Sequence, residues 1–284
     1  MNHEFCFVNG KFINTKEATI SLDDRAFLFG AGIYESIAVE NGLTFLLENH
    51  LDRLDLNLSL VGIKNPYSKK EWIRIVNDLI SKNHIQKAKC YIQVTDGTNI
   101  NRSHGNFGTP NTHVKLYPWN ETKLSNKAIT VVDQRWGMCH IKSTSLLANV
   151  IAAKNAAKQG CCEAIFKSND GHIYEGTSSN VFIVTKEQII TPPTSNKLLN
   201  GVTRQVVLQI AQENGLNYKE DHINIQDLYS ADECFTTSSY KKIHPITSID
   251  NHTIGNGQYG RITKMIDQLY NTFKRSVQSC LIAS

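Results

Sequence analysis

Two charged residues, Lys142 and Glu175, lie in parts of the sequence where a charge is unusual. Glu175 interrupts the run HIYEGTSSNVFIV at 172–184, whose composition is typical of a single strand interrupted by a few polar residues. A carboxylate buried in a sheet carries a large desolvation cost, so Glu175 needs a partner. Lys142 lies between an extended segment and the start of a predicted helix, near the edge of the predicted core. A lysine removed from water has a lowered pKa and becomes a nucleophile and a base.

A lysine, a carboxylate and an anion site are together what pyridoxal phosphate chemistry requires. The lysine holds the aldehyde of the cofactor, the carboxylate keeps the pyridine nitrogen protonated, and other donors hold the phosphate. Donors are present in LLNGVTRQVV, where Gly201, Val202 and Thr203 open a predicted helix whose backbone N–H groups bind anions readily. Arg53, on a leucine-striped helix, adds a cation, and TTSSY at 236–240 adds hydroxyl groups. Alone, each of these residues would be an ordinary exposed side chain.

Other catalytic motifs are not supported. GNGQYG at 255–260 has the glycine spacing of a dinucleotide-binding turn, but the chain after it has no acidic residue beyond Asp267 and no convincing second strand. The histidines show no H-x-x-x-H spacing, and Cys139 and His140 are adjacent, so no metal site is predicted. G-x-S-x-G, the signature of a hydrolase nucleophile, is absent.

The elements that must position these residues begin with two predicted hairpins. Asn-Gly pairs at 9–10 and 41–42 favour the positive φ angles of a type I′ turn. Leucines recur every three or four residues over 47–61 and predict a helix. Ser68, with Glu71 three residues further on, is typical of a capping box at the start of a second helix.

The remaining elements alternate less regularly. Strands are predicted at 90–95, 113–118, 128–134, 162–166, 217–223, 233–238 and 246–250, and helices at 145–159, 203–214, 225–230 and 258–276. Gly160 and Gly215 follow two of these helices, as glycines that end helices do. The mixture predicts an α/β (mixed α+β) fold with two subdomains, 1–118 and 128–284, joined by a linker at 119–127.

The composition argues against two classes of partner. The chain has 284 residues, 40% of them hydrophobic, and a formal net charge of +4 from 30 basic and 26 acidic residues. No stretch combines Lys and Arg with aromatic residues, so no nucleic-acid partner is expected. No apolar run approaches the roughly 18 residues that a membrane span needs. The N-terminus lacks a basic leader with an apolar core, and the seven cysteines show no C-x-x-C spacing, so we expect a cytoplasmic protein.

The segment IKSTSLLANVIAAKNAAKQGCCEAI, followed by EGTSSNVF and LNGVTRQVV, resembles the signature of fold-type IV pyridoxal-phosphate enzymes. These are the branched-chain aminotransferases, the D-amino acid aminotransferases and the aminodeoxychorismate lyases. The resemblance runs from about Phe7 to Phe273 and implies two subdomains that meet over the cofactor, in a homodimer. It implies that Lys142 holds the cofactor covalently, that Glu175 binds the ring nitrogen, that Leu199 packs on the ring, and that the phosphate is bound by Arg53, Val202, Thr203 and Ser239.

Within this family, FLFGAGIYESIAV and QVTDGTNINRSHGNF are most similar to D-amino acid aminotransferases. In those enzymes a tyrosine, here Tyr34, and an R-x-H motif, here Arg102 and His104, hold the α-carboxylate of the substrate, and the R-x-H motif comes from the partner subunit. An arginine offers a carboxylate a bidentate fork, and the long loop 96–111 fits a functional role. The loop departs from the family pattern at Asp96, where an arginine is expected.

The resemblance therefore implies a transaminase that moves the amino group of a D-amino acid, such as D-alanine, to 2-oxoglutarate. Its substrates would be amino acids and 2-oxo acids. A branched-chain L-amino acid aminotransferase and an aminodeoxychorismate lyase are the alternatives within the family. A protein that binds pyridoxal phosphate without turnover is the alternative from another class.

Overall fold

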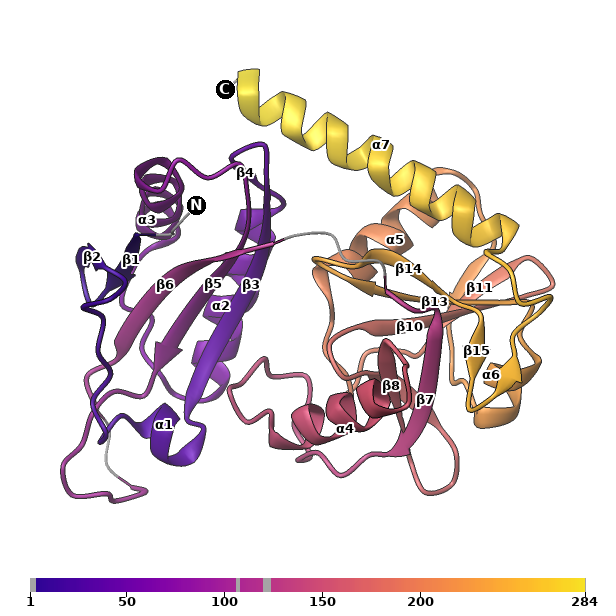
Figure 1. Cartoon of the computed structure of the whole chain (residues 1–284), viewed down its shortest axis with the longest axis horizontal. Helices are drawn as coiled ribbons and strands as arrows, with labels where there is room; N and C mark the ends of the chain where they lie inside the picture. Colours follow the sequence, from indigo (N-terminus) through magenta and orange to yellow (C-terminus); the bar gives the residue numbers. More distant parts are fainter. Residues whose placement is uncertain (1–3, 106–107, 120–123, 284) are drawn as a thin grey trace. The chain divides into compact units, whose positions relative to one another are not determined.

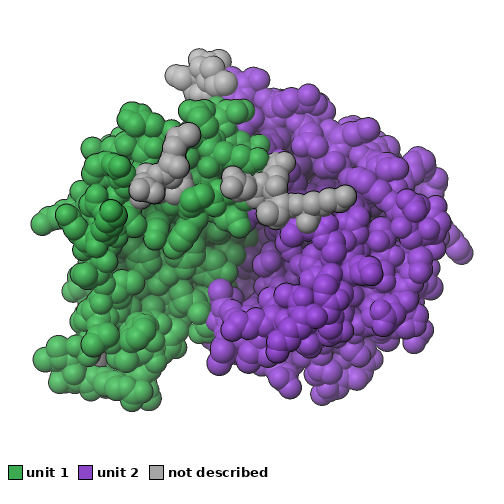
Figure 2. Space-filling view, viewed as in Figure 1, with its two compact units in different colours: residues 1–121, 141–145, 280–284 green, residues 122–140, 146–279 purple. Residues whose placement is uncertain are grey.

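The computed structural model describes residues 4–105, 108–119 and 124–283. The chain divides into two compact units, coloured separately in Figure 2. Unit 1 comprises Met1–Glu121, Ile141–Ser145 and Cys280–Ser284, and unit 2 comprises Thr122–His140 and Leu146–Ser279. The short segment that carries Lys142 thus groups with the N-terminal part of the chain. Four residues of the expected linker, 120–123, lie outside the described residues, so this linker and the subdomain boundaries stay predictions.

Unit 1 contains a six-stranded antiparallel sheet in the order β2-β1-β6-β5-β3-β4 (Figure 1). Its strands are β1 (Phe5–Val8), β2 (Lys11–Asn14), β3 (Gly32–Glu40), β4 (Leu43–Thr44), β5 (Lys87–Thr95) and β6 (Asn111–Pro118). Its helices are α1 (Arg25–Phe29), α2 (Leu47–Leu60) and α3 (Lys69–Lys82). Both predicted hairpins are confirmed, because the Asn-Gly pairs at 9–10 and 41–42 all have positive φ and join paired strands.

Helices α2 and α3 cover one face of this sheet. Leu54 and Leu58 of α2 and Trp72 of α3 are buried in one hydrophobic core with sheet residues such as Ile33 and Ile37. The leucine periodicity that predicted α2 is therefore the stripe that packs on the sheet. The predicted capping box at the start of α3 is also confirmed. Because side chains alternate along a strand, the neighbours of Ile33 and Ile37 in sequence point to the opposite face.

Unit 2 contains, in the described residues, a mixed sheet of ten strands. Its main path is β12-β11-β10-β9-β8-β7-β15-β16, while β13 pairs with β10 and β14 with β13. The strands are β7 (Lys127–Val132), β8 (Glu163–Lys167), β9 (Ile173–Gly176), β10 (Asn180–Thr185), β11 (Gln188–Thr191), β12 (Tyr218–Glu220), β13 (Glu233–Ser238), β14 (Lys242–Ile246), β15 (Ser248–Ile249) and β16 (His252–Thr253). The helices are α4 (Leu147–Lys158), α5 (Val202–Glu213), α6 (Ile225–Ser230) and α7 (Arg261–Ala283). Parallel and antiparallel pairs coexist, so the predicted fold class is confirmed.

Several details of the expected elements are wrong. The run 172–184 is a hairpin of β9 and β10, not one strand, because Thr177 and Ser179 turn back and donate their hydroxyls to the buried Glu163 carboxylate. The last helix begins three residues later than expected and ends at Ala283. The elements α1, β11 and β14 were not expected, since each has five residues or fewer and shows no periodic pattern.

The G-x-G-x-x-G motif is, as predicted, a turn before a helix. Gly255 and Gly257 have positive φ, and α7 begins directly after Gly260. The carboxylate of Glu233 accepts the first backbone N–H groups of α7, including that of Thr263 at 2.7 Å. A protein carboxylate therefore occupies the helix end that a dinucleotide would need. In the described ranges, no helix combines the length and the apolarity needed to cross a membrane.

Candidate active site

Glu175 has a partner in unit 2 that the sequence did not suggest. Arg135 Nη1 donates to Glu175 Oε1 at 2.5 Å, and the two side chains are 4% and 8% exposed. The same guanidinium donates to Asp133 at 2.9 Å and lies 4.1 Å from the centre of the Phe166 ring. The second oxygen of Glu175 accepts the backbone N–H of Leu199 at 3.0 Å. Glu175 is thus held by donors in one orientation, as a group that must present a fixed charge requires.

The turn 199–201 connects Glu175 to the start of α5. Asn180 Nδ2 donates to the carbonyl of Leu199 at 2.8 Å, while the N–H of Leu199 binds Glu175. Gly201 is the N-cap of α5, and the side chain of Asn180 lies where a Cβ at this position would be. Only glycine therefore allows this approach.

The start of α5 has the features of an anion site. Its N-cap, Gly201, offers no side-chain cap, and its first turn contains no acidic residue. The backbone N–H groups of Val202 and Thr203 lie in this turn, where no side-chain acceptor caps them. Both residues are buried, so the structure places the two predicted phosphate-binding residues at a sheltered helix end.

A buried hydroxyl on β13 lacks a partner beside this turn. Thr237 is 2% exposed, and its Oγ1 makes no hydrogen bond to any described residue. Thr237 lies directly opposite Asn180 in the β10–β13 pair, so the two side chains share a face of the sheet. Burying a hydroxyl without a partner is unfavourable, and such an atom is satisfied when a ligand supplies an acceptor. Ser239, the residue predicted from the sequence, follows two positions later, just beyond β13.

Lys142 lies in unit 1 beside Tyr34. Its backbone N–H donates to Asn57 Oδ1 at 2.6 Å, and its carbonyl accepts the N–H of Tyr34 at 3.0 Å. Its Nζ is 4.3 Å from the centre of the Tyr34 ring. The residue is half-buried, so Lys142 is not the exposed surface lysine of the alternative explanation. The structure brings together the predicted nucleophile and one of the predicted substrate-binding residues.

Arg53 belongs to a buried cluster of charges in unit 1. Its Nε and Nη2 donate to the two carboxylate oxygens of Glu35 at 2.7 and 2.9 Å, and His50 Nδ1 lies 2.7 Å from the same carboxylate. Burial raises the pKa of Glu35, but Arg53 and His50 outweigh it and hold this pKa well below its usual range. Burial lowers the pKa of His50. Arg53 is 12% exposed in a fixed orientation, and its contact with phosphate stays a prediction.

Arg102 and His104 contact one aromatic ring. The guanidinium carbon of Arg102 lies 5.2 Å from the centre of the Phe29 ring, and the imidazole of His104 meets the same ring edge-on at 4.9 Å. Both side chains are exposed, and Arg102 has a φ of 40°. Tyr34 makes other contacts, with Lys142 and with the stacked Tyr91 ring. One chain therefore groups the predicted carboxylate-binding residues into two separate sets.

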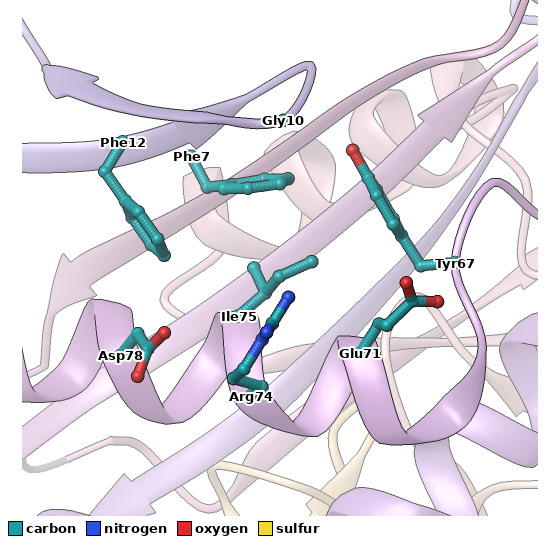
Figure 3. Close-up of a pocket in the computed structure, with 8 residues that line it drawn as sticks. All are labelled: Phe7, Gly10, Phe12, Tyr67, Glu71, Arg74, Ile75 and Asp78. Atoms are coloured by element: carbon teal, nitrogen blue, oxygen red, sulfur yellow. The ribbon is translucent and has the colours of Figure 1, made fainter.

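A cavity of about 330 Å³ lies between the β1–β2 hairpin and α3 in unit 1 (Figure 3). It is lined by Phe7, Gly10, Phe12, Tyr67, Glu71, Arg74, Ile75 and Asp78. The close-up shows aromatic rings along one side and the charged side chains rising from α3. None of the residues predicted for the active site lines it, and we assign it no part in the reaction.

A family model for amino-transferase class IV matches residues 32–249, which include Lys142 and Glu175. The chain belongs to this family. The class IV aminotransferase is 37% identical over 263 residues to a D-alanine aminotransferase of Bacillus licheniformis, with 91% of this chain and 93% of the relative covered. It is also 37% identical over 281 residues to a D-alanine aminotransferase of Staphylococcus epidermidis, with 96% and 98% covered.

Solved structures show the same fold. The branched-chain amino acid aminotransferase of Escherichia coli matches with a TM-score of 0.87 and 24% identity, over 95% of this chain and 94% of that one. Another branched-chain amino acid aminotransferase, solved with pyridoxamine 5′-phosphate, matches with a TM-score of 0.87 and 21% identity, over 95% and 94%. The predicted fold-type IV architecture is confirmed.

Class IV aminotransferases depend on pyridoxal phosphate, and the polar groups of this chain described above fit that cofactor. A fixed carboxylate, an uncapped helix start and an unpartnered buried hydroxyl lie along one connected stretch of unit 2. They match the protonated ring nitrogen and the phosphate of the cofactor in charge and hydrogen-bonding sense. Three residues that contribute to these contacts were not predicted as site residues from the sequence, namely Arg135, Glu35 and Thr237. Of these, only Thr237 had a signal, the TTSSY cluster.

Proposed function

We propose that this class IV aminotransferase transfers the amino group of D-amino acids, such as D-alanine, to 2-oxoglutarate. The observation that carries the proposal is the similarity to D-alanine aminotransferases, which extends over more than 90% of both chains. The contacts of Arg102 and His104 with Phe29 support it, because they give two carboxylate-binding side chains a common support. A branched-chain L-amino acid aminotransferase is the second candidate, favoured by the fold of the solved structures.

The proposed roles follow the chemistry of each side chain. Pyridoxal phosphate, when bound, supplies the aldehyde that receives the amino group and a ring that withdraws electrons from the substrate. The amine of Lys142 would hold this aldehyde until the amino group of the substrate displaces it, and the released amine would then take the proton from the substrate Cα. Glu175, oriented by Arg135 and the N–H of Leu199, keeps the ring nitrogen protonated. The side chain of Leu199 packs on the ring.

Four residues share the proposed phosphate-binding role. Val202 and Thr203 donate backbone N–H groups from the start of α5, and Ser239 adds a hydroxyl group. Arg53 adds a positive charge whose orientation is fixed by Glu35. This ion pair supports the role, since a guanidinium held on two carboxylate oxygens is fixed in orientation.

We also propose that the protein is a homodimer in which Arg102 and His104 serve the site of the partner subunit, opposite Tyr34. Large apolar side chains around α1 and the loop that carries Arg102 support this: Ile20, Leu22, Phe27 and Ile100 are 63%, 76%, 68% and 82% exposed. Such a group of exposed apolar residues is typical of a protein interface. A cytoplasmic location is the accompanying proposal, supported by seven cysteines that are all free thiols.

One assay tests the proposed activity. Purified protein is given 2-oxoglutarate with D-alanine, L-alanine or L-leucine, and the 2-oxo acid formed from each donor is measured. We expect D-alanine to be the better donor by at least about tenfold in kcat/KM, which corresponds to roughly 1.4 kcal/mol of discrimination. Preference for L-leucine would replace this proposal by the branched-chain activity. Cofactor binding without turnover of any donor would indicate a binding protein.

A further inference from the structure

Arg25 is a buried arginine that has no role in the proposed reaction. It is the first residue of α1 and is 6% exposed. Its Nε donates to Asp96 at 2.6 Å, and its other two nitrogens donate to the backbone carbonyls of Ser103 and His104 at 2.5 and 3.0 Å. One guanidinium therefore holds two successive peptide groups of the loop that carries Arg102 and His104.

The base of this arrangement is fixed by Asp24. Its Oδ1 caps α1 by accepting the N–H of Ala26 at 2.8 Å, and its Oδ2 accepts from Thr95 and Asn111 at 2.8 Å each. These two residues belong to β5 and β6, the strands on either side of the loop. The helix start that presents Arg25 is thus tied to both ends of the loop.

Phe29, at the other end of α1, completes the arrangement. The guanidinium carbon of Arg25 lies 5.3 Å from the centre of its ring, beside the contacts that Arg102 and His104 make with the same ring. Arg102 has a φ of 40°, a conformation that costs a non-glycine residue free energy and persists only when its surroundings impose it. The carbonyl bonds to Arg25, on the two residues that follow, supply that constraint.

We propose that Arg25 is a positioning residue for the α-carboxylate clamp, by which we mean Arg102 and His104 as the proposed binders of the substrate α-carboxylate. Arg25 holds the loop backbone in a conformation in which both side chains can donate to one carboxylate. The inference deepens the proposed function and rests on it. Arg25 does not touch the substrate and acts through the two carbonyls. A lysine at this position keeps the charge but cannot make the three directed bonds, because its ammonium is a point charge without the planar fork. Asp96 orients the fork, so Asp96→Asn should reproduce part of the effect.

The first test needs no substrate. Hydrogen exchange, followed by mass spectrometry of the holoenzyme, measures the loop amides of Asn99 and Asn101, which are hydrogen-bonded to Asp23 and to the Asn99 side chain. In Arg25→Lys we expect these amides to exchange about tenfold faster, because the loop opens locally without global unfolding. Arg74→Lys, the same change at an exposed arginine of α3, is the matched control and should leave the exchange unchanged. Equal exchange in Arg25→Lys and the wild type would overturn the proposal.

The second test separates positioning from simple stability. Arg25→Lys should raise the KM for D-alanine about tenfold or more while kcat and the visible absorbance of the cofactor change little. When Arg25→Lys is added to the Arg102→Ala/His104→Ala double variant, kcat/KM should change by no more than about twofold, because Arg25 acts through these two residues. Additive losses, or faster exchange with an unchanged KM, would overturn the proposal. If the wild type does not use D-alanine, the proposed function fails, while the exchange experiment still decides whether Arg25 holds the loop.

Discussion

Arg135 and Glu175 form a buried ion pair with an Nη1–Oε1 distance of 2.5 Å, although they are 40 residues apart. The strands nearest to them in the sequence are not neighbours in the sheet: β7, which precedes Arg135, is separated from β9, which contains Glu175, by β8. This ion pair explains how unit 2 can keep the Glu175 carboxylate buried. For the proposed contact with the ring nitrogen of the cofactor, the charge and the orientation of Glu175 are therefore fixed in advance.

Replacing Glu175 tests this fixed charge. Glu175→Gln keeps the shape but removes the charge, so kcat should fall about ten- to hundredfold, while the Kd for pyridoxal phosphate changes less. The measurements are pyruvate formation from D-alanine and cofactor titration. Glu213→Gln, at an exposed position of α5, is the control. An unchanged kcat with an intact fold would leave Glu175 a purely structural role.

The role of Lys142 is tested by substitution and by chemical labelling of its link to the cofactor. Lys142→Ala should lose turnover by several orders of magnitude, because we propose that the amine is both the covalent link and the base. In the wild type, borohydride should fix the cofactor to the peptide that contains Lys142, as read by mass spectrometry. Lys154→Ala, at an exposed position of α4, should behave as wild type. Labelling of another lysine would exclude the assignment.

Substitutions at Thr237 and at its neighbour Thr236 form a matched pair, of which only the first should change cofactor affinity. Thr237→Val should weaken pyridoxal phosphate binding about two- to tenfold, the loss of one hydrogen bond, without lowering the stability of the apoprotein. Thr236 also has a buried hydroxyl without a partner among the described residues, but its side chain points to the other face of β13. Thr236→Val should therefore leave cofactor affinity unchanged. Equal effects of the two changes in a cofactor titration would argue against a phosphate contact at Thr237.

The Glu35 cluster predicts acid sensitivity. The pKa of Glu35 is held below its ordinary 4.5 and burial lowers that of His50 below 6.5, so the unfolded chain binds these protons at higher pH than the folded chain. The free energy of unfolding should therefore fall as the pH drops below about 6.5, and more steeply below about 4.5.

Glu35→Gln should lower this free energy at pH 7 by about 3–5 kcal/mol, because it removes the buried negative charge that balances Arg53. Its profile should also be flatter than that of the wild type below about pH 4.5. Urea denaturation between about pH 2.5 and 8 measures both, with the exposed Asp52→Asn as the control. Profiles of equal slope would show that Glu35 does not titrate with unfolding.

Subunit mixing tests the origin of the carboxylate clamp. If Arg102 serves the partner subunit, an Arg102→Ala/Lys142→Ala heterodimer has one site with both lesions and one with neither. Mixing the two impaired proteins should then raise the activity to roughly a quarter of the wild-type value after random exchange. No recovery despite exchange verified by mass spectrometry would place Arg102 in the site of its own subunit.

Local patterns predicted the elements well and the contacts between elements poorly. The leucine stripe of α2 and the Asn-Gly hairpins depend on neighbouring residues, so the sequence alone identified them. Lys142, Glu175 and the start of α5 were predicted as site residues from their residue types in unusual settings, and their roles stay predictions. Arg135 could not be found in this way, since its contact depends on the order of β7, β8 and β9. The lack of a partner for Thr237 likewise depends on the register between β10 and β13.

The turn at Leu199 and Gly201 has a consequence for mutational tolerance. Leu199 binds Glu175 and Asn180 through its N–H and its carbonyl, so any residue except proline can keep both hydrogen bonds. Gly201 allows no such freedom, because a methyl group there would displace Asn180. A saturation library should therefore retain folded protein with many residues at 199 and almost none but glycine at 201. Evolution or design can vary the side chain at 199 without disturbing the backbone that joins the acid to the anion site.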